Sequence, residues 1–274
     1  IGKTAINAEG SRQESGLKIP DLENNTQIVK PEKKGIKDKA ACLEDRCPNS
    51  SKGRDIFVIL SVGHGMKNKT TYDPGSSSEW NKNTEITNGF FDVKYSPPSS
   101  VKYIDSNKIV EFQTNDILLK NYLIPAMKTN NINGDILIYR TNGITNHAQM
   151  LNKKAIELKK VYRKVIVLEF HFNSAKSGGS GTEMLYHSGV KPTKKLAECM
   201  QVEIVKKLGL KDRGIKDCSN GRGGGFMEGM PNIPSIMLEP FFISTKSDTK
   251  TFFEKIPEYI EGIMNGIIKY DNET

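Results

Sequence analysis

The chain has 274 residues, a formal charge of +8 and 36% hydrophobic residues, which is enough for one sizeable core and an appendage. Four cysteines are too few for a disulfide scaffold, and without a CxxC pair they argue against a cysteine zinc site. No apolar stretch is long enough to span a membrane.

The basic charge is compatible with a polyanionic partner such as nucleic acid, anionic lipid or an acidic cell-wall polymer. A solvated lysine-rich surface explains the charge equally well. The sequence contains no nucleic-acid recognition motif and no basic stripe with interleaved aromatic residues. We therefore expect no nucleic-acid partner.

Residues 1–53 are rich in Lys, Glu, Asn and Ser, and three prolines interrupt any periodic pattern. Such a segment buries too little apolar surface to offset the entropy lost on ordering. We expect a flexible arm or linker there, followed by one globular domain over residues 54–274. Within the arm, Cys42 and Cys47 are close enough in sequence to pair.

The first predicted strand, residues 56–60, leads into Gly63-His64-Gly65. We expect the two glycines to let the backbone turn tightly and to leave the His64 imidazole exposed at the edge of a sheet. The polar stretch at 66–100 is too long for a plain connection. It is predicted to be a functional loop over a site.

A helix is predicted at 107–128, where apolar residues recur at helical spacing. Glu111 falls in its first turn, where the helix dipole favours a carboxylate. The next strand, residues 136–139, ends at Arg140. A lysine-rich helix at 147–160 follows.

The strand at 165–170 is an apolar run that predicts burial on both faces, and it ends at His171. The alternation of strands and helices predicts an α/β fold: a single three-layer domain with a mixed, mostly parallel central sheet flanked by helices. The remaining predicted elements are an antiparallel strand at 182–186, a helix after Pro192, a strand at 235–238 ending at Glu239, and a helix at 252–268.

Two histidines and a glutamate at the ends of three apolar strands predict a metal site with a catalytic carboxylate, since ligands bind beyond the carboxyl ends of such strands. His64, His171 and one carboxylate would hold a catalytic zinc, which lowers the pKa of bound water. Glu239 is the candidate general base. Directly after an apolar strand, its carboxyl would be partly desolvated, which raises the pKa.

Structural roles compete with each assignment, because a single histidine at a strand end is more often structural than a ligand. Glu239 could instead pair with Arg140 or Lys246. Glu169 shares the side of the pleat that carries His171. It could hydrogen-bond a ligand histidine, although a structural ion pair is the favoured interpretation.

From about Asp55 to Thr251, the chain resembles the zinc-dependent N-acetylmuramoyl-L-alanine amidases of bacterial autolysins and phage endolysins. The matching motifs are Gly63-His64-Gly65, Asp73-Pro74-Gly75, Glu111 with Asn115, Arg140, His171-Phe172-Asn173-Ser174, Gly181-Thr182-Glu183, Arg213-Gly214, and Glu239 with Phe241-Phe242.

The resemblance implies a Zn²⁺ ion held by His64, Glu111 and His171, with Glu239 as the catalytic residue. It also implies substrate contacts by Arg140 and Asn173. The implied reaction is hydrolysis of the amide between N-acetylmuramic acid and the L-alanine of the stem peptide. The enzyme would act on peptidoglycan in an extracellular, periplasmic or virion-associated place.

Two departures from the family pattern lie between Gly65 and Glu111. This stretch is unusually long, so Glu79 or Glu85 could compete for the role of carboxylate ligand, although the helical context favours Glu111. In addition, Met66 stands where a further glycine is usual. The spacer up to Tyr72-Asp73-Pro74-Gly75 resembles that of some phage enzymes, which favours a phage lysin. The N-terminal arm could then dock to a phage or tail assembly.

Two alternative functions remain open at this point. A zinc carboxypeptidase-like peptidase is disfavoured because Lys67 occupies the offset from His64 where His-x-x-Glu places its glutamate. A non-catalytic wall-binding or virion structural module on an amidase scaffold is the other. Retention of all four site residues weighs against it.

Overall fold

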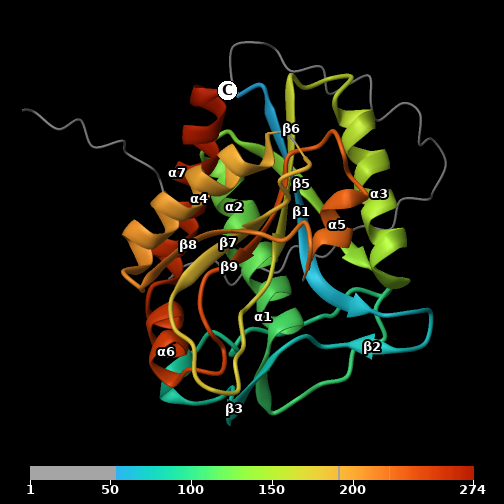
Figure 1. Ribbon diagram of the computed structural model, residues 1–274. Coiled ribbons are helices and arrows are strands. Elements are labelled where there is room, and N and C mark those ends of the chain that lie inside the picture. The colour runs from blue at the N-terminus through green and yellow to red at the C-terminus, as the bar shows by residue number, and fades with distance from the viewer. Residues whose placement is uncertain (1–53, 191, 222) are drawn as a thin grey trace, which may run out of the picture.

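The computed structural model describes residues 54–190, 192–221 and 223–274. The predicted arm, with Cys42 and Cys47, lies outside the described residues. From Arg54 onward the chain forms three layers, with a central sheet between two sets of helices (Figure 1). This is the α/β architecture that the alternation of strands and helices predicts.

The central sheet is mixed and mostly parallel, as predicted. Four parallel strands lie side by side in the order β5, β1, β6, β9, with β7 antiparallel to β9 and β8 parallel to β7. A short β2 pairs antiparallel with the end of β1. The strands are β1 (Ile56–Met66), β2 (Tyr72–Asp73), β5 (Asn133–Arg140), β6 (Lys164–Phe170), β7 (Thr182–Tyr186), β8 (Asp212–Asp217) and β9 (Ser235–Glu239).

Each face of the sheet has its own apolar core, because successive side chains of a strand point to opposite faces. Along β6, Ile166, Leu168 and Phe170 face the larger core, whereas Val165 and Val167 face the smaller one. Helices α3 (Gly143–Leu158) and α5 (Gly224–Glu228) cover the smaller core (Figure 1). The larger core is covered by α1 (Glu111–Leu118), α2 (Ile124–Thr129), α4 (Thr193–Leu208), α6 (Lys246–Glu254) and α7 (Ile256–Glu273).

The helix predicted at 107–128 begins later than its apolar spacing indicates. Its first residues belong instead to β4 (Lys108–Val110), which pairs antiparallel with β3 (Ser77–Asn81). Glu111 is therefore the first residue of α1. A π-helical turn, Leu119–Leu123, joins α1 to α2, so the predicted helix is widened shortly before Pro125, whose nitrogen cannot donate an intrahelical hydrogen bond.

Two other predicted helices have different boundaries. Helix α3 begins at Gly143, four residues before the predicted start. The closing helix predicted at 252–268 is divided into α6 and α7, with a proline in the first turn of α7. Among the described helices, none combines the length and the apolar character needed to cross a bilayer.

Candidate metal centre and active site

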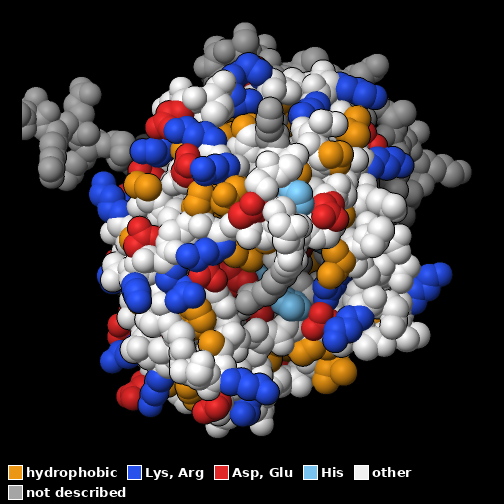
Figure 2. Space-filling view, viewed as in Figure 1, with side chains coloured by type: hydrophobic (Ala, Val, Ile, Leu, Met, Phe, Trp, Pro, Cys, Tyr) orange, Lys and Arg blue, Asp and Glu red, His pale blue; other side chains and the backbone are white. Residues whose placement is uncertain are grey.

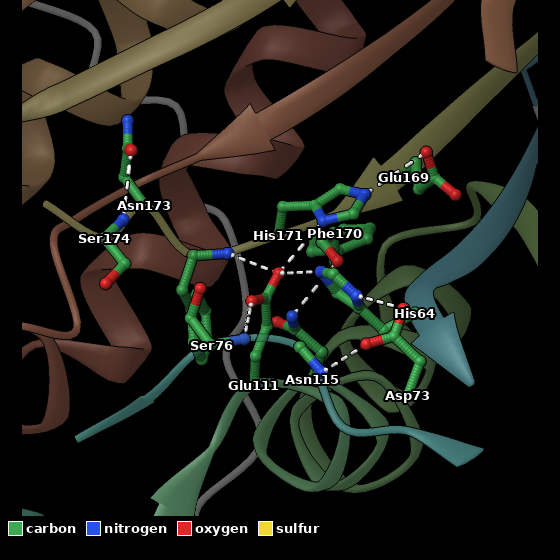
Figure 3. A network of polar contacts seen from close by, with 12 residues as sticks. His64, Asp73, Ser76, Glu111, Asn115, Glu169, Phe170, His171, Asn173 and Ser174 are labelled. Atoms are coloured by element: carbon green, nitrogen blue, oxygen red, sulfur yellow. Dashed lines mark hydrogen bonds and ion pairs between the residues drawn. The ribbon is translucent and has the colours of Figure 1, made fainter. Parts of the chain in front are cut away.

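His64, near the carboxyl end of β1, meets Glu111 and His171, the residue that follows β6. One ligand atom from each lies within 4.8 Å of the others. Glu111 Oε1 lies 3.2 Å from His64 Nε2 and 2.9 Å from His171 Nδ1. Figure 3 shows the two imidazoles and the carboxylate turned toward one another. The structure thus brings together the three residues that the family resemblance implies as metal ligands.

The Gly63-His64-Gly65 segment distorts β1, and this distortion sets the direction of the His64 side chain. The pairing of β1 with β5 shifts register between Val62 and Gly65, and His64 itself has a φ of 70°. A non-glycine residue in this region is strained, and such strain gathers at functional sites. The strand continues to Met66, so in place of the predicted tight turn there is a distortion within β1 at His64 and Gly65, whose φ is 107°.

Gly63 has a different role from the one expected, because its φ is not positive. A Cβ atom added at Gly63 would lie 2.3 Å from Cε1 of His171. Only glycine leaves room for the second imidazole against the backbone of β1. The first glycine of the motif therefore positions His171.

Gly75 and Asp73 hold the other side of the centre. A Cβ atom at Gly75 would lie 2.6 Å from His64 Cδ2 and 2.7 Å from Glu111 Oε2. The Asp73 carboxylate lies 3.1 Å from His64 Nδ1, so Nε2 of that ring faces Glu111. The Asp-Pro-Gly motif, nine residues away in sequence, thus orients the first histidine.

Glu111 is 1% exposed and is held by backbone donors. The amide of Ser76 donates to Oε2 over 2.7 Å, and the amide of Phe172 donates to Oε1 over 2.9 Å. The competing carboxylates, Glu79 and Glu85, are both exposed. The structure therefore places Glu111, rather than either competitor, beside the histidines.

The charges at the centre reinforce one another. Burial opposes ionisation of Glu111, but the nearby His64 and His171 outweigh it, and the pKa of this carboxyl lies well below its usual range. Burial likewise disfavours the charged imidazoles, yet Glu111 raises the pKa of both rings, with help from Asp73 at His64 and Glu169 at His171. The pocket therefore has a strong attraction for positive charge.

The donor set fits a zinc ion. Two imidazole nitrogens and one carboxylate oxygen are ligands that catalytic zinc takes, with a further position open for water. The remaining nitrogen of each ring faces a carboxylate, Asp73 for His64 and Glu169 for His171. Such contacts select which ring nitrogen is presented to a metal.

Glu239 ends β9, the strand that pairs with β6. Met237 is level with Glu169 in the β6–β9 ladder, so two residues later Glu239 and His171 face the same side of the sheet. Glu239 is 1% exposed, as expected for a carboxyl after an apolar strand. The metal-ligating cluster found among the described residues does not include it.

Arg140 and Asn173 occupy opposite flanks of the centre. The Arg140 guanidinium donates to Asp73, and Arg140 and His171 both line a cavity of about 100 Å³. Asn173 is buried, and its Nδ2 donates to Glu183 on β7.

Glu183, the partner of Asn173, also binds Arg213, so the three side chains form a polar chain. The sequence by itself assigned no role to Glu183 or Arg213. Arg213 Nε donates to the second oxygen of Glu183 over 2.7 Å and lies over the ring of Phe242. Glu183 also borders a larger cavity of about 490 Å³. Glu183 and Arg213 belong to matched motifs, which was the available signal, but only the fold brings them to Asn173.

Figure 2 presents one face of the molecule. Histidine side chains are visible near its centre beside acidic groups, while lysine and arginine side chains are dispersed around the rim. On this face the excess positive charge is therefore not gathered into a stripe of the kind that binds nucleic acid.

Comparison with known families gives a match over most of the chain. The profile of the N-acetylmuramoyl-L-alanine amidase family matches residues 58–269. This range contains every residue of the centre and both of its flanks. No curated protein sequence matches the chain.

Solved structures show a related fold at low sequence identity. Cwp6 from Clostridium difficile is 21% identical with a TM-score of 0.52, over 79% of this chain and 29% of that one. The amidase Ami1 from Mycobacterium smegmatis is 14% identical with a TM-score of 0.51, over 82% of this chain and 100% of that one. The catalytic domain of the CD27L endolysin, which targets Clostridia difficile, is 17% identical with a TM-score of 0.50, over 76% and 96%.

Proposed function

The chain belongs to the N-acetylmuramoyl-L-alanine amidase family, and we propose that it hydrolyses peptidoglycan at the amide between N-acetylmuramic acid and the L-alanine of the stem peptide. We propose residues 54–274 as the catalytic domain and the bacterial cell wall as its place of action. Family membership favours this reaction over that of a carboxypeptidase-like peptidase.

One observation carries the proposal: His64 Nε2, His171 Nδ1 and Glu111 Oε1 converge at one point, and each ring is oriented by a further carboxylate. We propose these three residues as the ligands of Zn²⁺. When bound, zinc supplies an activated water and polarises the substrate carbonyl.

Glu239 is proposed to move the proton. A carboxylate oxygen of Glu239 would accept a proton from the attacking water and donate it to the departing nitrogen of L-alanine. Its buried place at the end of β9, on the same side of the sheet as His171, supports this role.

Arg140 and Asn173 are proposed to bind and orient the substrate from opposite flanks. Arg140 carries a positive charge that suits the carboxylates or carbonyls of a stem peptide. The amide of Asn173 can bond to both the donors and the acceptors of a peptide or sugar. Its bond to Glu183 holds Asn173 in place.

The decisive experiment is mass spectrometry of purified peptidoglycan after digestion. The expected products are free stem peptides that begin with L-alanine, together with glycan strands that keep intact lactyl groups. Products cut within the peptide or between sugars would contradict the proposed bond.

Glu239→Gln tests the proton-transfer role. We expect the variant to bind zinc as the wild type does but to lose activity by at least about 10²-fold, the low end of what general acid–base catalysis contributes. Zinc content is measured by atomic emission, and hydrolysis by release of stem peptide. Near-wild-type turnover by this variant would remove Glu239 from the mechanism.

A non-catalytic wall-binding module is the remaining alternative. It predicts that the purified chain sediments with peptidoglycan but leaves wall turbidity unchanged, even with zinc added. A fall in turbidity that depends on zinc favours the enzyme.

We also propose that the protein is a phage lysin, released during lysis or attached to the tail. The spacer from Met66 up to Tyr72-Asp73-Pro74-Gly75, which resembles that of some phage enzymes, supports this origin. Residues 1–53 would then dock to a phage or tail assembly. Full wall hydrolysis with no assembly defect after deletion of residues 1–50 would contradict the docking role.

A further inference from the structure

A second polar cluster lies behind His171, between β1, β6 and α3. Its members, Ser61, His147 and Glu169, are 0%, 1% and 4% exposed. Ser61 is level with Glu169 in the β1–β6 ladder, and both point toward the smaller core. A polar group in such a place costs free energy unless it is paired. The contacts of these three side chains must therefore offset the cost of burying them in the smaller core.

The contacts run from α3 to the metal centre. Ser61 Oγ lies 2.7 Å from His147 Nε2 and donates to Glu169 Oε1 over 3.4 Å. The His147 ring approaches the same carboxylate oxygen at 3.6 Å. The other oxygen, Oε2, lies 3.3 Å from His171 Nε2 (Figure 3).

The last of these contacts is the one that matters for His171. Glu169 Oε2 and His171 Nε2 are both buried, and among the described residues neither makes a hydrogen bond, so their contact is the ion pair at 3.3 Å. Buried polar atoms in native proteins almost always have a partner. The ion pair gives each of these atoms the other as its partner, and it leaves Nδ1 of His171 directed at Glu111.

We propose that Glu169, held in place by Ser61 and His147, is a positioning residue that fixes the ring of His171 and thereby selects Nδ1 as the metal-binding nitrogen. The inference deepens the proposed function, since it takes His171 as a ligand of the metal. It assigns roles to Glu169, His147 and Ser61 that act through the ring of His171.

The test measures zinc affinity directly, by competition with a chromophoric chelator, and the visible absorption of the Co²⁺-substituted protein. Loss of a supporting partner of a metal-bound histidine lowers metal affinity by about 10–100-fold. We expect Glu169→Met, which removes both charge and acceptor, to lose affinity in this range and to change the Co²⁺ spectrum. Glu169→Gln keeps an acceptor and should lose less.

His147→Gln probes the support of Glu169 and should weaken zinc binding by less than Glu169→Met does, because Ser61 still contacts the carboxylate. Glu157→Gln, on the exposed side of α3, is the matched control and should leave both readouts unchanged. Should Glu169→Met fail to fold, Glu169→Gln and His147→Gln carry the test.

Unchanged zinc affinity and an unchanged Co²⁺ spectrum in the folded Glu169→Gln and His147→Gln variants would overturn the proposal. The readouts also separate it from the proposed function. A wild-type protein that binds no zinc refutes the metal site itself. A wild type that binds zinc without cutting the amide refutes the function and leaves the positioning role testable.

Discussion

Three neighbours determine how the ring of His171 lies. Glu111 faces its Nδ1, Glu169 faces its Nε2, and the backbone at Gly63 closes against the ring. Precise placement of a ligand is costly to lose, since metal affinity depends on the geometry of the supporting residues. Two predictions belong to this scale.

Gly63→Ala should weaken zinc binding by at least about tenfold, the scale on which loss of supporting geometry lowers metal affinity. The added methyl would lie 2.3 Å from the His171 ring, so the ring must move. Chelator competition measures the change. Gly221→Ala is the control, because a Cβ there meets nothing within 4 Å. Equal affinities of the two variants would show that the ring tolerates the intrusion.

Cys218 should react slowly with alkylating agents. The thiol is 6% exposed, and burial, aided by the charge of Asp217, raises the pKa of Cys218 to about 11. Because the thiolate is the nucleophile, alkylation at pH 8 should be on the order of 100-fold slower than for a free cysteine. Peptide mass spectrometry after timed iodoacetamide treatment measures the rate. A rate equal to that of free cysteine would mean that the thiol is accessible and ionised.

At the scale of elements, the packing of α4 against α7 depends on small residues at the contact. A Cβ at Gly262 would lie 3.1 Å from Ile204 Cα, and one at Gly266 would lie 2.5 Å from Met200 Sδ. The two helices thus approach closely enough for backbone to meet side chain. The larger core beneath them backs the strands that carry the metal centre.

Gly262→Leu should destabilise the protein by roughly 1–3 kcal/mol, the usual cost of overpacking. The gain in helix propensity, at most about 1 kcal/mol, only partly offsets this. Denaturant unfolding followed by circular dichroism gives the difference. Glu258→Leu, at an exposed position of α7, should change stability by less than about 1 kcal/mol. A Gly262→Leu protein as stable as that control would contradict the close packing.

At the scale of the whole molecule, the proposed metal would tie together distant parts of the chain. Its ligands come from β1, from the start of α1 and from the residue after β6. A ligand that binds only the folded state stabilises it by about 2.7 kcal/mol at 100 times its dissociation constant. Metal loading should therefore be visible in thermal unfolding.

Removal of zinc with a chelator should abolish amidase activity and lower the unfolding temperature by roughly 5–10 °C, at about 2–4 °C per kcal/mol for a domain of this size. Scanning calorimetry before and after dialysis, with zinc restored, measures the shift. His171→Ala should unfold at the same temperature with and without zinc. Activity that survives complete metal removal would contradict a metal-dependent mechanism.

Several features of this protein follow from the sequence by itself. Apolar runs and their polar ends predict the parallel strands and place His64, His171 and Glu239 at the ends of three of them. This is possible because a buried strand shows in the sequence as a short run of apolar residues. The helical spacing of the apolar residues around Glu111 likewise favours this residue as the carboxylate ligand. The match of 58–269 to the amidase family agrees with the motifs quoted around these residues.

Other features were decided only by tertiary structure. Pairing with β3 turned the predicted first residues of a helix into β4, and the role of Gly63 depends on an imidazole that follows 108 positions later. Asp73 behind His64, and the Ser61–His147–Glu169 cluster behind His171, are likewise contacts between distant segments. Periodicity reports on one strand or helix at a time, whereas these contacts exist only once several elements have packed together.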